Sequence, residues 1–87
     1  MTLNDALLKV GVYYCISPFQ ALFKKSIIRI EVRKVNRKSS TITENGSKKF
    51  ECAHGDWDEW VAFTNYWHAY AESLKREAEY ERDSVHS

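Results

Sequence analysis

The sequence predicts an α+β domain with a short N-terminal helix, an antiparallel sheet of about four strands, and a long C-terminal helix packed on the sheet. Three observations predict it. Residues 26–35 alternate between apolar and polar side chains, Asn45-Gly46 is a hairpin signal, and apolar residues recur at spacings of three and four within residues 57–82. We expect a single domain, 1–87, whose core draws on three Trp, five Tyr and four Phe.

The N-terminal part is expected to form a short helix followed by a strand. Thr2 is a favourable cap for the helix, because its side chain can accept from a free backbone N–H. Residues 10–16 are rich in β-branched and aromatic residues, which predicts a strand. Pro18 would end that strand, since proline lacks the N–H that a ladder needs. Residues 19–25 fit either a helical turn or a loop.

A three-strand meander is predicted for the middle of the chain. The alternation within residues 26–35 is typical of an antiparallel strand with one face in water. Residues 39–43 return after a turn, Asn45-Gly46 tolerates the positive φ of a type I′ turn, and residues 47–52 pair back. Such a sheet could curl into a small SH3-like barrel, although no fifth strand is predicted.

The C-terminal segment is expected to form one long helix from Trp57 to about Arg82. Asp56 would cap its first turn, with Glu59 at the reciprocal capping position. The stripe predicted to be buried consists of Trp60, Phe63, Trp67, Tyr70, Ala71, Leu74 and Ala78. Because the sheet is too short to cover such a helix, its last turns are expected to project.

An alternative makes residues 60–63 a last strand and caps a shorter helix at Thr64. We favour the single helix because the apolar stripe passes Thr64 without a change of phase. Residues 84–87 are expected to fray, as chain ends commonly do.

The sequence predicts no catalytic residue, metal site or cofactor. Cys15 and Cys52 are too few for a disulfide scaffold and are expected to be reduced and buried. The spacing of Cys52 and His54 does not fit a zinc site. Three carboxylates follow His54 within residues 56–59, but helix capping explains them, and no nucleophile elbow, phosphate-binding loop or HExxH motif is present. We therefore expect a protein that is not an enzyme.

The chain is expected to lie in the cytoplasm, of a bacterium or of an infected host cell, without contact with a membrane. No run reaches the ~18–20 apolar residues of a membrane span. Residues 1–5 also lack the basic start and apolar stretch of a signal peptide.

The charge is distributed unevenly. The net charge is +1, yet residues 24–49 hold nine Lys or Arg against two Glu, and residues 50–87 hold nine Asp or Glu against three Lys or Arg. An asymmetry of this kind carries information about partners and not about the fold.

The leading hypothesis is a non-catalytic module that binds a protein or protein complex. Aromatic residues off the buried stripe would serve as anchors, and the acidic helix face would meet a partner of opposite charge. The candidate partner-binding residues are Trp57, Tyr66, Glu72, Glu77, Glu79 and Glu81, with Asp83 on the same acidic face. Homodimerisation through the projecting helix is compatible with this hypothesis.

The alternative hypothesis is nucleic-acid binding by the basic face of the meander, which would follow the phosphate backbone. Its candidate residues are Arg29, Arg33, Arg37, Lys38, Lys48 and Lys49. The same residues would also fit the solvated face of an amphipathic sheet, where Lys and Arg protect edges.

A resemblance adds to these expectations. The residues that carry it are 30–38, Thr41-Ile42-Thr43, Asn45-Gly46, Lys48-Lys49-Phe50 and Trp57-Asp58-Glu59. In this pattern the chain resembles small uncharacterised phage and prophage proteins with an SH3- or KOW-like strand meander and a C-terminal helix. The resemblance implies an early or accessory protein that binds and inhibits a host protein or defence complex. These proteins have no assigned site, so the resemblance implies no functional residue.

Overall fold

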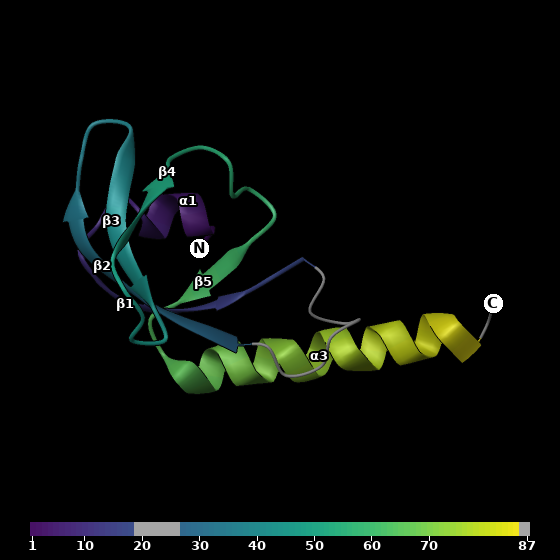
Figure 1. The fold of residues 1–87 in the computed structure, drawn as a ribbon. Helices are drawn as coiled ribbons and strands as arrows, with labels where there is room; N and C mark the ends of the chain where they lie inside the picture. Colours follow the sequence, from purple (N-terminus) through teal and green to yellow (C-terminus); the bar gives the residue numbers. More distant parts are fainter. Residues whose placement is uncertain (19–26, 86–87) are drawn as a thin grey trace.

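The computed structural model describes residues 1–18 and 27–85, with side chains as far as Glu79. In this part of the chain, a five-stranded antiparallel sheet of order β4-β3-β2-β1-β5 packs against helices (Figure 1). The elements are α1 (Leu3–Ala6), β1 (Gly11–Ile16), β2 (Ile27–Val35), β3 (Ser39–Glu44), β4 (Phe50–Ala53), β5 (Val61–Phe63) and α3 (Tyr66–Val85). The α+β class predicted from the sequence is confirmed.

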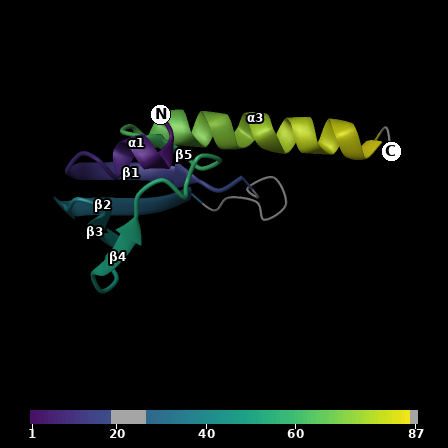
Figure 2. The ribbon, with the colours of Figure 1, turned by 90° about the horizontal axis from the view of Figure 1, so that it is seen from above.

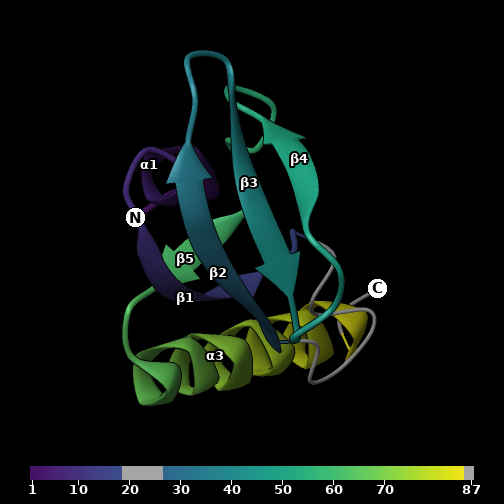
Figure 3. The same cartoon turned by 60° about the vertical axis from the view of Figure 1, so that its left-hand side comes forward.

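The main core lies on the inner face of the sheet, where α1 covers it. Successive strand residues point to opposite faces, so the paired residues Tyr13 and Ile30 point inward together. Leu7, at the end of α1, is fully buried among them. The core cluster consists of Leu3, Ala6, Leu7, Tyr13, Cys15, Ile30, Val32, Ile42, Cys52 and Ala62. Figure 3 shows the sheet twisting from β5 and β1 behind to β2, β3 and β4 in front.

A bulge in β2 adjusts the alternation to the core. Val32 and Lys34 pair with consecutive residues of β3, so Arg33 is the extra residue. The insertion returns Val35 to the inner face, where it packs against the core cluster. Arg33 and Lys34 are both exposed as a result.

The outer face of the sheet holds a second, smaller contact layer under α3. The helix contacts β1, β5 and β2 with its first turns and then continues beyond the sheet (Figure 2). Ala69 is fully buried and Ser73 nearly so at this contact. The ring of Tyr66 meets that of Tyr14 from β1 at a centroid distance of 5.6 Å, edge to face.

Two sequence predictions about the C-terminal half are wrong. The sheet has five strands in the described part of the chain instead of about four, because Val61–Phe63 forms β5. Consequently α3 begins at Tyr66, not at Trp57, and the alternative with a strand at residues 60–63 was the better one. The physical reason is long-range: β5 pairs with β1, and Ala62 fills a fully buried position in the core.

The capping prediction changes with the helix. Asp56 does not cap a helix, because residues 54–60 form turns that lead into β5. The Asn65 side chain instead accepts a hydrogen bond from the Trp67 backbone N–H at 2.8 Å, which satisfies one free donor of α3. The alternative placed the cap at Thr64, and the structure has it at the next residue, Asn65.

Two local predictions are confirmed. Thr2 caps α1 by accepting from the Asp5 backbone N–H, and Asn45 and Gly46 both have positive φ, at 51° and 78°. Residues 19–25, predicted as a helical turn or a loop, lie outside the described residues. The last helix runs to Val85, so its backbone includes the first two residues of the expected tail 84–87.

Candidate protein-binding surface

The outer face of α3 carries an exposed apolar row. We call Trp67, Ala71, Leu74 and Ala78 the outer seam; all four are exposed, Trp67 at 70% and Leu74 at 49%. Trp67 and Ala71 each lie two positions from the buried Ala69, or about 200° around the helix. Trp67 and Ala71 therefore face away from the protein's own sheet, roughly opposite the buried Ala69.

A chain of rings holds Trp67 in place although it is exposed. Its ring lies 5.3 Å from that of Tyr66 and 6.0 Å from that of Tyr70, both edge to face. Tyr66 in turn packs on Tyr14 of the sheet. Tyr66 and Tyr70 also line a cavity of about 160 Å³ beside α3, together with Leu74 of the seam and Ile27 of β2. An aromatic side chain fixed in this way loses little conformational entropy on binding a partner.

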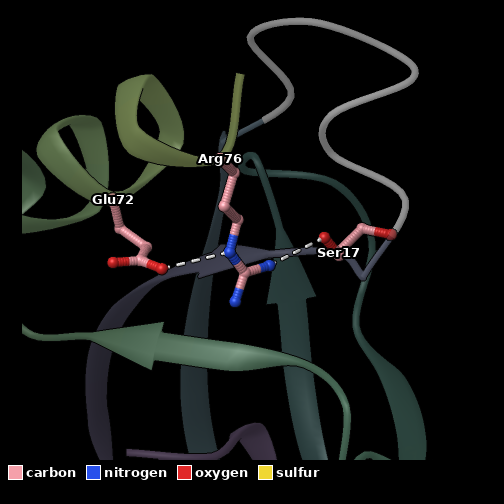
Figure 4. Close-up of polar contacts among 3 residues, drawn as sticks. All are labelled: Ser17, Glu72 and Arg76. Atoms are coloured by element: carbon pink, nitrogen blue, oxygen red, sulfur yellow. Dashed lines mark hydrogen bonds and ion pairs between the residues drawn. The ribbon is translucent and has the colours of Figure 1, made fainter. Parts of the chain in front are cut away.

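The middle of α3 is tied to the end of β1 by Arg76. Its Nε donates to Oε1 of Glu72 at 3.2 Å, one helical turn earlier, and its Nη1 donates to the carbonyl of Ser17 at 3.4 Å (Figure 4). The charge of Glu72 is therefore paired within the protein. Such a half-exposed pair contributes at most about 1 kcal/mol, so its main effect is to orient the helix.

The residues predicted to bind a partner do not form one surface. Trp57 is half-buried, packs on the core cluster, and donates from Nε1 to the carbonyl of Ala53 at 2.9 Å. Glu72 is paired and Glu77 half-buried, whereas Glu79 is exposed. The side chains of Glu81 and Asp83 lie outside the described part. Tyr66 alone belongs to the aromatic cluster that supports the outer seam.

The sequence prediction missed the exposure of the seam. It placed Trp67, Tyr70 and Leu74 in the buried stripe, but Tyr70 is 40% exposed and the other two are more so. The buried positions of α3 are the small residues Ala69 and Ser73. Two small residues four apart on a helix were the available signal, because they allow the backbone to approach the sheet closely.

The basic residues predicted to bind nucleic acid are all exposed; five of them lie toward the two ends of the β2–β3 pair, and Arg33 lies between, at the bulge in β2. Arg37 and Lys38 lie at the β2–β3 turn, and Lys48 and Lys49 follow β3 at the opposite end (Figure 3). At ~3.4 Å per strand residue, Arg29 lies roughly 27 Å from Arg37 along the strand direction.

Carboxylates interrupt the basic face between these ends. Glu31 pairs with Arg33 at 3.2 Å. Glu51 of β4 accepts hydrogen bonds from Ser39, Thr41 and Asn36. The Thr41 and Ser39 hydroxyls, the Asn36 amide and the nearby Lys34 charge lower the pKa of Glu51, so this acid is held ionised on the sheet surface.

A buried serine and a histidine lie within hydrogen-bond distance but serve the fold. Ser40 is fully buried, and its hydroxyl donates to the carbonyl of Leu7. Its oxygen lies 2.7 Å from Nε2 of His54. A hydroxyl has one proton to donate, so Ser40 accepts from Nε2–H of His54 while its own proton is held by Leu7. The arrangement joins α1, β3 and the segment after β4.

Both cysteines are buried and free, as predicted. Burial, with smaller effects of Cys52 and Glu44, raises the pKa of the Cys15 thiol to about 12. Burial also raises the pKa of Cys52. Neither thiol is therefore available as a nucleophile at neutral pH. Among the described residues, no group of three or more His, Cys, Asp or Glu side chains is placed to hold a metal ion.

Within residues 1–18 and 27–85, no helix combines the length and the apolar character needed to cross a bilayer. Comparison of the chain with protein-family models, with curated proteins and with solved structures found no match. The candidate surface is therefore defined by the geometry of α3 alone.

Proposed function

We propose that the protein is a non-catalytic protein-binding module whose docking surface is the outer seam of α3. The observation that carries the proposal is Trp67, which is 70% exposed and lies edge to face against the rings of Tyr66 and Tyr70. Large exposed apolar side chains in line on one face mark interaction sites, and tryptophan is the residue most enriched at their centres. Leu74 extends the same row by two helical turns.

The spacing of the seam indicates the chemistry of the partner. Positions 67, 71, 74 and 78 form a straight apolar ridge about 16 Å long, which fits a groove between helices or a single helix laid alongside. The exposed Glu79 lies near one end of the ridge and adds an acidic contact. We expect a partner that supplies an apolar helical surface.

The resemblance to phage proteins, together with this surface, supports a role during infection of a host cell. We propose an accessory protein that binds and inhibits a host protein or defence complex in the cytoplasm of a bacterium or infected cell. The strand order, a meander with the last strand beside the first, supports the SH3-like part of that resemblance.

Nucleic-acid binding by Arg29, Arg33, Arg37, Lys38, Lys48 and Lys49 is the second candidate function. The exposure of all six favours it. Their spread between the two ends of the β2–β3 pair and the intervening Glu31 and Glu51 weaken it, because a phosphate track needs adjacent positive charges.

Site-specific photo-crosslinking in cells tests the proposal. A photoreactive residue replaces Trp67 in one variant and Leu8 in the control, since Leu8 is 60% exposed and lies in the turn after α1, far from the seam. We expect protein adducts of defined mass from position 67 and none from position 8. Equal adducts from both positions, or none from 67, would refute the seam as the docking surface.

A binding assay decides between the two functions. Labelled single- and double-stranded nucleic acid is titrated with the parent and with an Arg37→Glu/Lys38→Glu variant at two salt concentrations. Tight, salt-sensitive binding that the charge reversal abolishes would favour the second candidate. We expect no such binding.

A further inference from the structure

We propose that the partner seated on the outer seam is a second copy of this chain, with the two α3 helices antiparallel. The inference rests on the proposed function, because it concerns the same surface: a second copy occupies the seam in the free protein, and a host protein would displace it. It is carried by the order of side-chain sizes along the seam and by the place of α3 in the fold.

The seam has the spacing of a helix-pairing surface. From Trp67 to Ala71, Leu74 and Ala78 the steps are four, three and four residues, which is the a/d pattern of a heptad repeat. A surface helix that packs only on its own sheet needs a single apolar face, the one that meets the sheet. In α3 the buried residues toward the sheet are Ala69 and Ser73, and Trp67 and Ala71 of the heptad row lie on the other side. Leu74 lies between the two sides, because it also borders the cavity that Ile27 of β2 lines.

The seam matches a second seam that runs in the opposite direction, because large residues of one then lie opposite small residues of the other. Large and small side chains alternate: Trp67, Ala71, Leu74, Ala78. The midpoint between Trp67 and Ala78 is also the midpoint between Ala71 and Leu74, and it lies between residues 72 and 73. When two such helices run antiparallel about that point, each Trp67 meets an Ala78 and each Leu74 meets an Ala71.

This match is what a two-fold contact requires. An interface with two-fold symmetry uses the same patch on both copies, so the patch must complement itself. A large residue opposite a small one fills space without overlap. A parallel pair would instead place Trp67 against Trp67 and Ala78 against Ala78, with a collision at one end and a gap at the other.

Among the described residues, the position of α3 leaves room for a second copy. Figures 1 and 2 show that the sheet lies on one side of the helix and that the C-terminal half extends past the sheet. The molecule measures 45 Å along its longest axis and about half as much along the others. In the antiparallel pair, the two sheets lie on opposite sides and at opposite ends, and each projecting half covers the Trp67 end of its neighbour.

The expected dimer is a weak one. The seam is about 16 Å long, which corresponds to a small contact below the standard ~1,600 Å² interface. We therefore expect a monomer–dimer equilibrium that depends on concentration in the micromolar range or above. Because symmetry places Trp67 in the contact twice, its truncation is expected to weaken the dimer by roughly 30-fold or more.

Sedimentation of the purified full chain over a wide concentration range tests the inference. We expect a dimer that is lost in Trp67→Ser and in Leu74→Ser and kept in Leu8→Ser, the control with a similarly exposed residue in the turn after α1. Circular dichroism confirms that each variant is folded. A monomer at near-millimolar concentration would overturn the inference, and so would a dimer that Trp67→Ser leaves intact.

A size exchange tests the antiparallel register. Ala78→Trp alone is expected to weaken the dimer by collision with Trp67, and Trp67→Ala alone by leaving a gap. The double variant Trp67→Ala/Ala78→Trp restores large against small and is expected to recover most of the affinity. Strictly additive losses would overturn the register.

Failure of this inference can be told from failure of the proposed function. A chain that stays monomeric but forms heterologous protein adducts from position 67 would keep the docking surface and assign it to another protein. A chain that stays monomeric and forms no adduct from position 67 would overturn both.

Discussion

Replacing Leu7 by alanine is expected to destabilise the protein far more than the same change at Leu8. Leu7 is the C-cap of α1 and Leu8 lies in the turn after it, so neither change falls within the helix Leu3–Ala6. Leu7 is fully buried in the core cluster, whereas Leu8 is 60% exposed. A buried Leu→Ala change costs about 2–5 kcal/mol, and a surface change about 0.5 kcal/mol or less.

The magnitude follows from how little α1 can adjust. Its carbonyl at Leu7 is held by the buried Ser40, so the short helix cannot move to fill the space. We therefore expect about 3 kcal/mol for Leu7→Ala. A domain of this size is stabilised by roughly 4–13 kcal/mol in total, and the loss corresponds to a melting temperature lower by about 12–24 °C.

Urea unfolding followed by tryptophan fluorescence measures both variants against the parent. We expect a clearly lower midpoint for Leu7→Ala with an unchanged slope, and a midpoint near the parent's for Leu8→Ala. Equal midpoints would refute the inference that α1 closes the core, because Leu7 would then contribute no packing energy to it.

Three further predictions address the surface and the helix start. Glu51→Gln is expected to be less stable than the parent at neutral pH. The lowered folded-state pKa of Glu51 gives a contribution that is complete above its ordinary pKa, roughly 4.3, and is lost as the pH falls through the lowered value. The stability gap should therefore close in acid, and a gap that is constant with pH would contradict the cause given. The Cys15 thiol, with a pKa of about 12, should react with iodoacetamide orders of magnitude more slowly in the folded protein than in urea; rapid labelling of folded protein would contradict its burial. Asn65→Ala should cost about 1 kcal/mol by removing the cap of α3, and Asn65→Asp should cost much less; equal losses in thermal melts would place the helix start elsewhere.

The central meander was predictable because its signals are local. The alternation within β2 and the positive φ at Asn45 and Gly46 each depend on a few adjacent residues. The bulge at Arg33 was not predicted, since nothing near it in sequence marks the extra residue; it follows from the pairing of β2 with β3.

The strand β5 was not predictable from local pattern. It has three residues, and its partner β1 lies more than forty positions earlier in the chain. Trp60 and Phe63 happen to stand at helical spacing before Trp67, so the pattern of the strand merges with that of the helix. Residues 61–63 form a strand because Ala62 pairs with Cys15, and rules based on neighbouring residues cannot predict such a long-range pairing.

The candidate surface was partly predictable. The apolar row containing Trp67 and Leu74 is recognisable as a stripe, but the only sequence signal for the face that meets the sheet is the weaker pair of small residues, Ala69 and Ser73. The large residues were assigned to the core because burial of big rings is usual in a small domain. In this protein the small residues Ala69 and Ser73 are buried instead, which leaves the large residues outside.

The contact between the start of the chain and β5 covers an edge of the sheet that could otherwise pair with a strand of another molecule. Thr2 forms an isolated bridge with Val61, the Leu3 N–H donates to the Trp60 carbonyl, and the Ala62 N–H donates to the Met1 carbonyl. These bonds occupy backbone groups along an edge that another chain's strand could otherwise extend. The partners lie about sixty positions apart, and closing a flexible loop of that length costs roughly 3.6 kcal/mol of chain entropy. Without these bonds β5 would present an open edge, and loss of the first three residues is therefore expected to promote aggregation more than to change the fold.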